Sequence, residues 1–116
     1  MMRRGEVRLV DLDPARRSEA AKRRPAVVVS NDRANAAAAR LGRGVVTVVP
    51  LTSNTARIFP FQVLVPGDQA GLRVDSKAQA EQVRSVDVVR MGAAIGQVPA
   101  PLMAAIDDAL RLHLDL

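Results

Sequence analysis

The stretch that decides the fold is a run of β-branched residues that directly follows a cluster of positive charge. It reads Arg24-Pro25-Ala26-Val27-Val28-Val29-Ser30. Valine favours extended backbone and packs well on a pleated surface, so an apolar run of this kind is typical of a buried strand. A second run of the same type spans residues 45–51, and the polar residues 52–55 close it. The sequence therefore predicts two buried strands.

Shorter segments on both sides of these runs predict further strands and two helices. The expected strands are residues 6–12, residues 61–65, a short strand at Leu72 and Val74, residues 76–86 and residues 95–98. Ala-rich residues 33–41 predict a short helix, with Asn31-Asp32 as its cap and Gly42 as its stop. Helical spacing near the end of the chain predicts a C-terminal helix that packs through Leu102, Ile106, Ala109, Leu110 and His113. Many short strands with few helices indicate a mainly β fold, a small and partly open barrel.

Length and composition limit the kinds of protein that this chain can be. Its 116 residues, 48% of them hydrophobic, fit a single domain over residues 1–116 and can bury a core. The chain has no run of eighteen apolar residues and no secretion signal at its start, so we expect a cytoplasmic protein without a membrane span. It has no cysteine and one histidine, which excludes disulfides, a thiol nucleophile, cysteine-ligated zinc and a two-histidine acid–base pair. We therefore expect neither a metal ion nor a cofactor.

Positive charge is concentrated in the first half of the chain. Residues 1–58 contain twelve basic and five acidic side chains, whereas residues 59–116 contain five basic and seven acidic ones. Fifteen of the seventeen cations are arginines, whose planar guanidinium binds phosphate in a bidentate manner. Five cations and one carboxylate lie within residues 14–24, which we expect to form a mobile surface loop. The asymmetry favours an anionic partner, although a nucleotide bias of the source is an alternative explanation for the preference for Arg over Lys.

Several short motifs follow one another along the chain. They are Arg4-Gly5-Glu6-Val7, Val10-Asp11-Leu12-Asp13-Pro14, Ser18-Glu19, residues 24–30, Val49-Pro50-Leu51-Thr52-Ser53, Phe59-Pro60-Phe61 and Glu81-Gln82-Val83-Arg84-Ser85-Val86. In this order they resemble the MazF/PemK toxins over essentially the whole chain. The resemblance implies a homodimer of SH3-like, partly open barrels of the CcdB/MazF type, each with a short helix and a C-terminal helix.

The same resemblance implies a sequence-specific, metal-independent endoribonuclease of a type II toxin–antitoxin system. Such an enzyme cleaves single-stranded RNA (mRNA) through attack of the neighbouring 2′-hydroxyl, which leaves a 2′,3′-cyclic phosphate and a 5′-hydroxyl. A cognate acidic antitoxin, similar to MazE, would neutralise it. Two other interpretations stay open: a barrel toxin that poisons a protein target such as DNA gyrase without cleaving anything, and a degenerate toxin that binds without turnover.

The resemblance also implies catalytic roles for three residues. Arg24 matches the family's Arg-Pro position, and we expect it to stabilise charge on the phosphate, because arginine stays protonated at pH 7 and is a poor base. Thr52 matches the family's catalytic threonine, and its hydroxyl is expected to hold a phosphate oxygen and fix the in-line geometry. Glu19 matches the Ser-Glu position and is the expected general base, although the cations around it would weaken it in that role.

RNA contacts are expected from residues close to these three. The candidates are Arg16, Arg17, Lys22, Arg23, Ser53 and Gln82. Gln82 and Arg84 have an alternative role, which is to brace the dimer. Two positions depart from the family: Arg8 stands where Trp or Tyr is common, and Arg17 where Gly commonly precedes Ser-Glu. With only Phe59 and Phe61 as aromatics, stacking on RNA bases would depend largely on arginine.

Overall fold

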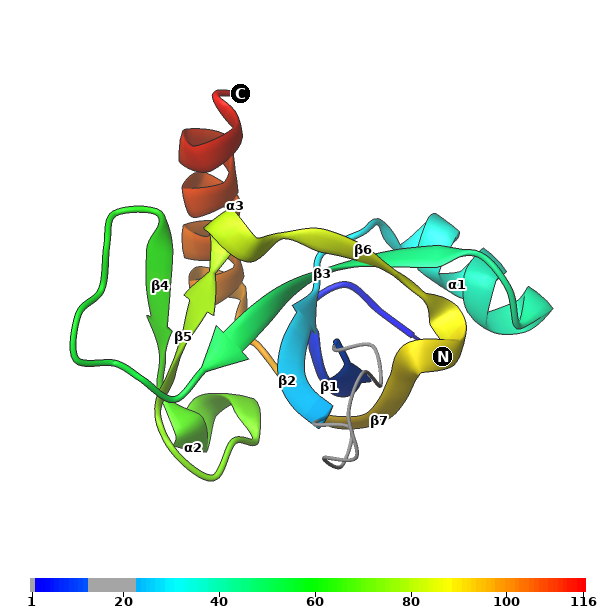
Figure 1. Cartoon of the computed structure of the whole chain (residues 1–116), viewed down its shortest axis with the longest axis horizontal. Helices are drawn as coiled ribbons and strands as arrows, with labels where there is room; N and C mark the ends of the chain where they lie inside the picture. The colour runs from blue at the N-terminus through cyan, green and yellow to red at the C-terminus, as the bar shows by residue number, and fades with distance from the viewer. Residues whose placement is uncertain (1, 13–22) are drawn as a thin grey trace, which may run out of the picture.

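The computed structural model describes residues 2–12 and 23–116, and within them the strands form one seven-stranded antiparallel sheet (Figure 1). The strands are β1 (Glu6–Asp11), β2 (Arg23–Val28), β3 (Val45–Thr52), β4 (Gln62–Val65), β5 (Ser76–Gln79), β6 (Arg84–Asp87) and β7 (Met91–Gln97). The helices are α1 (Asp32–Leu41), α2 (Gly67–Ala70) and α3 (Ala100–Leu114), with the short 3-10 helices η1 (Ala80–Gln82) and η2 (Val88–Arg90). The predicted mainly β fold with a C-terminal helix is confirmed.

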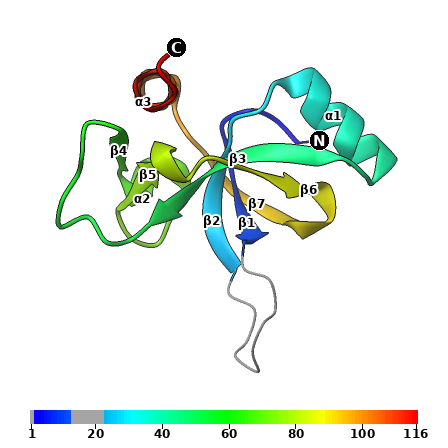
Figure 2. The same ribbon diagram turned by 45° about the horizontal axis from the view of Figure 1, so that its top comes forward.

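Strand β3 is the central strand of this sheet, because it pairs with three other strands. One edge of β3 pairs with β2, with Val28 opposite Val48. The other edge pairs first with β6 and then, over its last two residues, with β5. The strand order is β4-β5-β3-β2-β1-β7, with β6 also paired to β3, and the strands β2, β1, β7 and β6 curve into a partly open barrel (Figure 1). Figure 2 shows α3 beside β4 and β5, with α1 on the opposite side of the molecule.

The valine runs are buried on both faces, which explains their uninterrupted apolar pattern. Val28 and Val48 belong to a cluster inside the barrel, together with Val10 and Val86. The residues next to them, Val27 and Val49, belong to a second cluster that packs against α3. This cluster consists of Val7, Val27, Val49, Leu51, Val65, Ala70, Ala78, Val98, Met103 and Ile106. Successive residues of a strand point to opposite faces, so each valine run supplies both clusters at once.

Helix α1 has the caps that the sequence predicts at both of its ends. The Asn31 side chain accepts a hydrogen bond from the backbone N–H of Ala34 at 2.8 Å. Gly42 ends the helix in the left-handed conformation, with a φ of 65°. A side-chain cap at one end and a left-handed glycine at the other satisfy backbone groups that a helix end leaves unpaired.

Other predicted boundaries are wrong. The region of Leu72 and Val74 is not a strand but part of the turn that follows α2, where Gly71 has a φ of +75°. The single strand predicted over residues 76–86 is interrupted by η1, because β5 and β6 pair with different parts of β3. Strand β7 begins at Met91 rather than at residue 95, and β2 begins at Arg23 rather than after a loop ending at residue 24.

The apolar stripe of α3 is only partly confirmed. Ile106 and Ala109 are buried, but His113 is exposed, and its ring lies 6.4 Å from that of Phe61. The helix continues past the end of the sheet, so its last turn has no strand to pack against (Figure 1). Periodicity alone does not show where the packing partner of a helix ends.

Candidate functional site

A cavity of about 670 Å³ opens where β2 begins and β3 ends. Arg23, Arg24, Thr52 and Ser53 all line it. The paired part of the β2–β3 ladder ends where Ala26 lies opposite Pro50. Arg24 and Thr52 each lie two residues beyond this last pair, one on each strand. Two residues far apart in the sequence therefore line the same cavity.

The wall of this cavity is apolar and its polar groups are cationic or hydroxyl-bearing. The remaining lining residues are Leu9, Pro25, Leu51, Gly71, Leu72, Arg73, Val74, Ser76 and Ile95. No carboxylate is found among the described residues of the lining. A cavity with three guanidinium groups, hydroxyls and an apolar wall suits an anionic ligand that also has a flat apolar part.

A second, smaller cavity of about 310 Å³ adjoins the first. Its lining residues are Leu12, Arg24, Pro50, Leu51, Gln79, Gln82 and Arg84. Arg24 and Leu51 line both cavities, so Arg24 lies at their common boundary. The second cavity presents two amides, which can donate to and accept from the edge of a nucleobase. The two cavities that share Arg24 and Leu51 are referred to together as the groove.

The arginines near this groove divide into two groups. Arg84 donates from Nη1 to the carbonyl of Leu12 at 2.9 Å and so ties β6 to the end of β1. Arg8 donates from Nε to Glu6 and from Nη1 to the carbonyl of Gly92, both at 2.9 Å, so its guanidinium is engaged within the fold. By contrast, the side chains of Arg23 and Arg24 are exposed and have neither a hydrogen bond nor an ion pair to any residue in the described ranges. These two are available to an anion.

Thr52 adds a hydroxyl-bearing side chain to the lining of the larger cavity. Its Oγ1 accepts a hydrogen bond from the backbone N–H of Asn54 at 3.3 Å. A hydroxyl that accepts through its oxygen keeps its own proton to donate. Thr52 can therefore donate to a phosphate oxygen that Arg24 also contacts.

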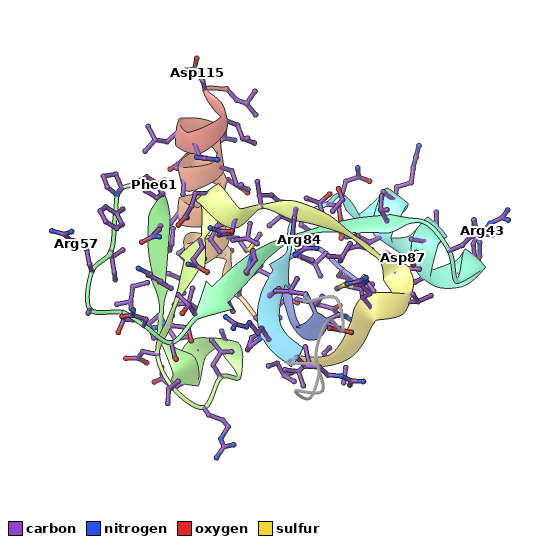
Figure 3. The ribbon with its side chains drawn as sticks, viewed as in Figure 1. Arg43, Arg57, Phe61, Arg84, Asp87 and Asp115 are labelled. Atoms are coloured by element: carbon purple, nitrogen blue, oxygen red, sulfur yellow. The ribbon has the colours of Figure 1, made fainter. Side chains whose placement is uncertain are left out.

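The two phenylalanines lie on the β3–β4 connection, outside both cavities. Their rings are stacked, with centroids 5.4 Å apart and 2° between the planes, and the Arg57 guanidinium lies 5.3 Å from the centroid of Phe59. Figure 3 shows Phe61 near the top of β4 and Arg57 on the same connection, to the left of β4. No aromatic ring of the described residues lines either cavity, and stacking of RNA bases on arginine there stays a prediction.

The structure brings together part of the site predicted from the sequence. Arg23, Arg24, Thr52 and Ser53 share one cavity, and Gln82 lines the adjoining one. The remaining predicted residues, Arg16, Arg17, Glu19 and Lys22, lie outside the described residues. Sequence reasoning missed Arg73, Ser76 and Gln79, since their positions in the groove depend on how distant segments pack. The described ranges contain no group of three or more metal-ligating side chains, and no helix in them is long and apolar enough to cross a membrane.

Comparisons with family models, with known proteins and with solved structures all identify the same protein family. Residues 3–114 match the family described as "PemK-like, MazF-like toxin of type II toxin-antitoxin system". The chain is 65% identical over 116 residues to endoribonuclease MazF9 of Mycobacterium tuberculosis, covering 100% of this chain and 98% of that protein. A solved mycobacterial endoribonuclease in complex with its cognate antitoxin superposes with a TM-score of 0.78 at 27% identity, covering 100% of this chain and 97% of that one. MazF from Deinococcus radiodurans superposes with a TM-score of 0.75 at 28% identity, covering 99% and 97%.

Proposed function

Because the chain belongs to the PemK-like, MazF-like family of type II toxins, whose relatives include endoribonucleases, we propose that it cleaves single-stranded RNA in the groove centred on Arg24. The observation that carries the proposal is that Arg24, whose side chain has no partner among the described residues, lines one cavity with the hydroxyl-bearing Thr52 and with further cations. Such a cavity attracts a phosphodiester and offers donors at the phosphorus where negative charge develops.

The proposed reaction is an internal attack on phosphorus. The 2′-hydroxyl of the nucleotide before the scissile bond gives its proton to a general base and attacks phosphorus. The bond from phosphorus to the 5′-oxygen breaks, and this oxygen takes up a proton from solvent. The products are a 2′,3′-cyclic phosphate and a 5′-hydroxyl. Arg24 stabilises the additional charge on the phosphate oxygens, and Thr52 donates to one of them and fixes the in-line geometry. No lining residue in the described part of either cavity is a carboxylate, so the base comes from elsewhere, and Glu19 is the candidate.

The remaining contacts serve binding. We assign Arg23 and Ser53 to the RNA backbone at the first cavity and Gln82 to a base edge in the second. Arg16, Arg17 and Lys22 are proposed to hold further phosphates. A groove that accepts a polyanion also accepts an acidic peptide, and a solved relative is described as an endoribonuclease in complex with its cognate antitoxin. We therefore propose that an acidic, MazE-like antitoxin covers this groove, that the toxin acts as a homodimer, and that its mRNA substrate places its action in the cytoplasm.

A cleavage assay in excess EDTA tests the proposed chemistry. The purified protein is incubated with a 5′-labelled single-stranded RNA and with a matched RNA that carries one deoxyribose at the cleaved nucleotide. Cleavage of the all-ribose RNA in EDTA, with products that end in a cyclic phosphate, and full resistance of the deoxy substrate are expected. Cleavage of the deoxy substrate at the parent rate would exclude internal attack. Tight RNA binding without any product would instead indicate a toxin that binds without turnover.

A further inference from the structure

Arg73 is a further cation of the larger cavity and comes from a different segment of the chain than Arg24. It lies in the turn between α2 and β5, whereas Arg24 lies on β2, and both line the 670 Å³ cavity. Arg73 is exposed and, like Arg24, has no hydrogen bond or ion pair to another residue of the described ranges. The sequence motifs that identify the family do not include it.

The turn that carries Arg73 is fixed by close backbone contacts on both sides. A Cβ at Gly71 would lie 2.1 Å from the carbonyl oxygen of Ile95, so the turn touches β7 directly. On the other side of Arg73, the Asp75 carboxylate accepts from the backbone N–H of Gly67 at 2.8 Å and closes the turn. The backbone at residue 73 is therefore held in place before any ligand binds, which lowers the entropy cost of using its side chain.

The cavity that Arg73 and Arg24 share also has apolar lining, which includes Leu51, Leu72 and Ile95. Phosphates do not bind to such surfaces, but the face of a nucleobase or the carbon skeleton of a ribose does. A cavity lined by cations from two segments and by apolar side chains therefore suits a nucleotide together with the phosphates on both sides of it.

We propose that Arg73 binds the phosphate next to the scissile one, while Arg24 acts on the scissile phosphate itself. This inference rests on the function proposed above and adds a backbone subsite to it. Arg73 is then a binding residue for substrate and product, and it does not take part in bond breaking. Its removal lowers affinity and leaves the chemical step nearly intact, the reverse of what is expected for Arg24.

The first test compares two variants that remove the same charge. Arg73→Ala deletes the proposed contact, and Arg43→Ala deletes an exposed arginine at the end of α1, on the opposite side of the molecule from α2 (Figures 1 and 3). Affinity for an uncleavable RNA with one deoxyribose at the cut site is measured against salt. For Arg73→Ala, Kd rises roughly tenfold, as for loss of one charged hydrogen bond, and the salt slope becomes shallower by about 0.7, the value for one phosphate contact on a single strand. Arg43→Ala leaves both values at the parent level, and kcat of Arg73→Ala with cleavable RNA stays close to that of the parent.

The second test locates the phosphate. Uncharged methylphosphonates replace, one at a time, the scissile phosphate and its neighbours on both sides. Replacing the phosphate that Arg73 contacts weakens binding by the parent but not by Arg73→Ala, whereas replacement elsewhere weakens both proteins equally. Three results would each overturn the proposal. One is that the methylphosphonate at the scissile position is the one that weakens the parent but not Arg73→Ala. The others are an equal rise in Kd for Arg73→Ala and Arg43→Ala, and a fall in kcat of Arg73→Ala without a change in Kd. Failure of the proposed function is a separate outcome, in which the parent leaves cleavable RNA intact.

Discussion

Replacement of Arg24 by alanine is the most direct test of the groove. The side chain is exposed and has no partner among the described residues, so its removal is expected to change the free energy of unfolding by less than about 0.5 kcal/mol. The loss of one preorganised charge stabiliser costs about 2.7–4 kcal/mol in the transition state, which corresponds to roughly 100- to 1000-fold in rate. Solvent screens an open groove, and Arg23 and Arg73 remain in it, so we expect the lower end of this range.

The assay for Arg24→Ala is single-turnover cleavage of a labelled RNA, with thermal unfolding measured in parallel. Arg24→Lys keeps the charge but lacks the planar fork, and little recovery of the rate is expected. Arg43→Ala is the matched control, with parent-like rate and melting temperature. A parent-like rate for Arg24→Ala would refute the site assignment. A melting temperature more than about 4 °C below that of the parent would show instead that the residue supports the fold.

Three further predictions concern neighbouring features. Thr52→Val keeps the shape of the side chain but removes the hydroxyl, so single-turnover kinetics should show a larger loss in kcat than in affinity; the opposite pattern would assign Thr52 to binding. Gly96→Ala places a Cβ 1.8 Å from the Ala70 carbonyl oxygen and should lower stability by about 2 kcal/mol in chemical denaturation, whereas Gly42→Ala, with nothing within 4 Å, should cost about 1 kcal/mol. Reversal of Arg16, Arg17 and Arg23 to Glu should slow association of an acidic antitoxin peptide and flatten its salt dependence in stopped-flow measurements; unchanged association would place the peptide elsewhere.

The sequence was a reliable guide wherever the deciding signal was local. The β-branched runs became β2 and β3 because these strands are buried on both faces, and the caps of α1 act within a few residues of each other. Arg24 and Thr52 could be selected because the family resemblance marks their motifs, and the structure places both in one cavity. Their catalytic roles remain predictions.

Features that depend on contacts between distant segments could not be predicted. Leu72 and Val74 alternate like a strand, but the left-handed backbone at Gly71 turns the chain so that Arg73 reaches the groove. That turn is fixed by the close approach of Gly71 to Ile95 and of Gly96 to Ala70, and no local pattern shows which backbones approach each other. In the same way, the break at η1 follows from β3 having two partners on one edge.

The geometry of the groove follows from the packing of the core. In the observed register Val28 faces Val48 inside the barrel, and Val27 faces Val49 on the side of α3. A slip of one residue would place Val28 opposite Val49 and would mix the two clusters, since the side chains of a strand alternate between its faces. The two hydrophobic clusters therefore stabilise the same register, and Arg24 and Thr52 follow just beyond the last pair of that ladder, where both line the larger cavity. The cation and the hydroxyl extend from strands whose positions the core already determines, so the proposed site is in place before RNA binds, and the contacts of the bound RNA can contribute to the chemistry rather than to ordering the site.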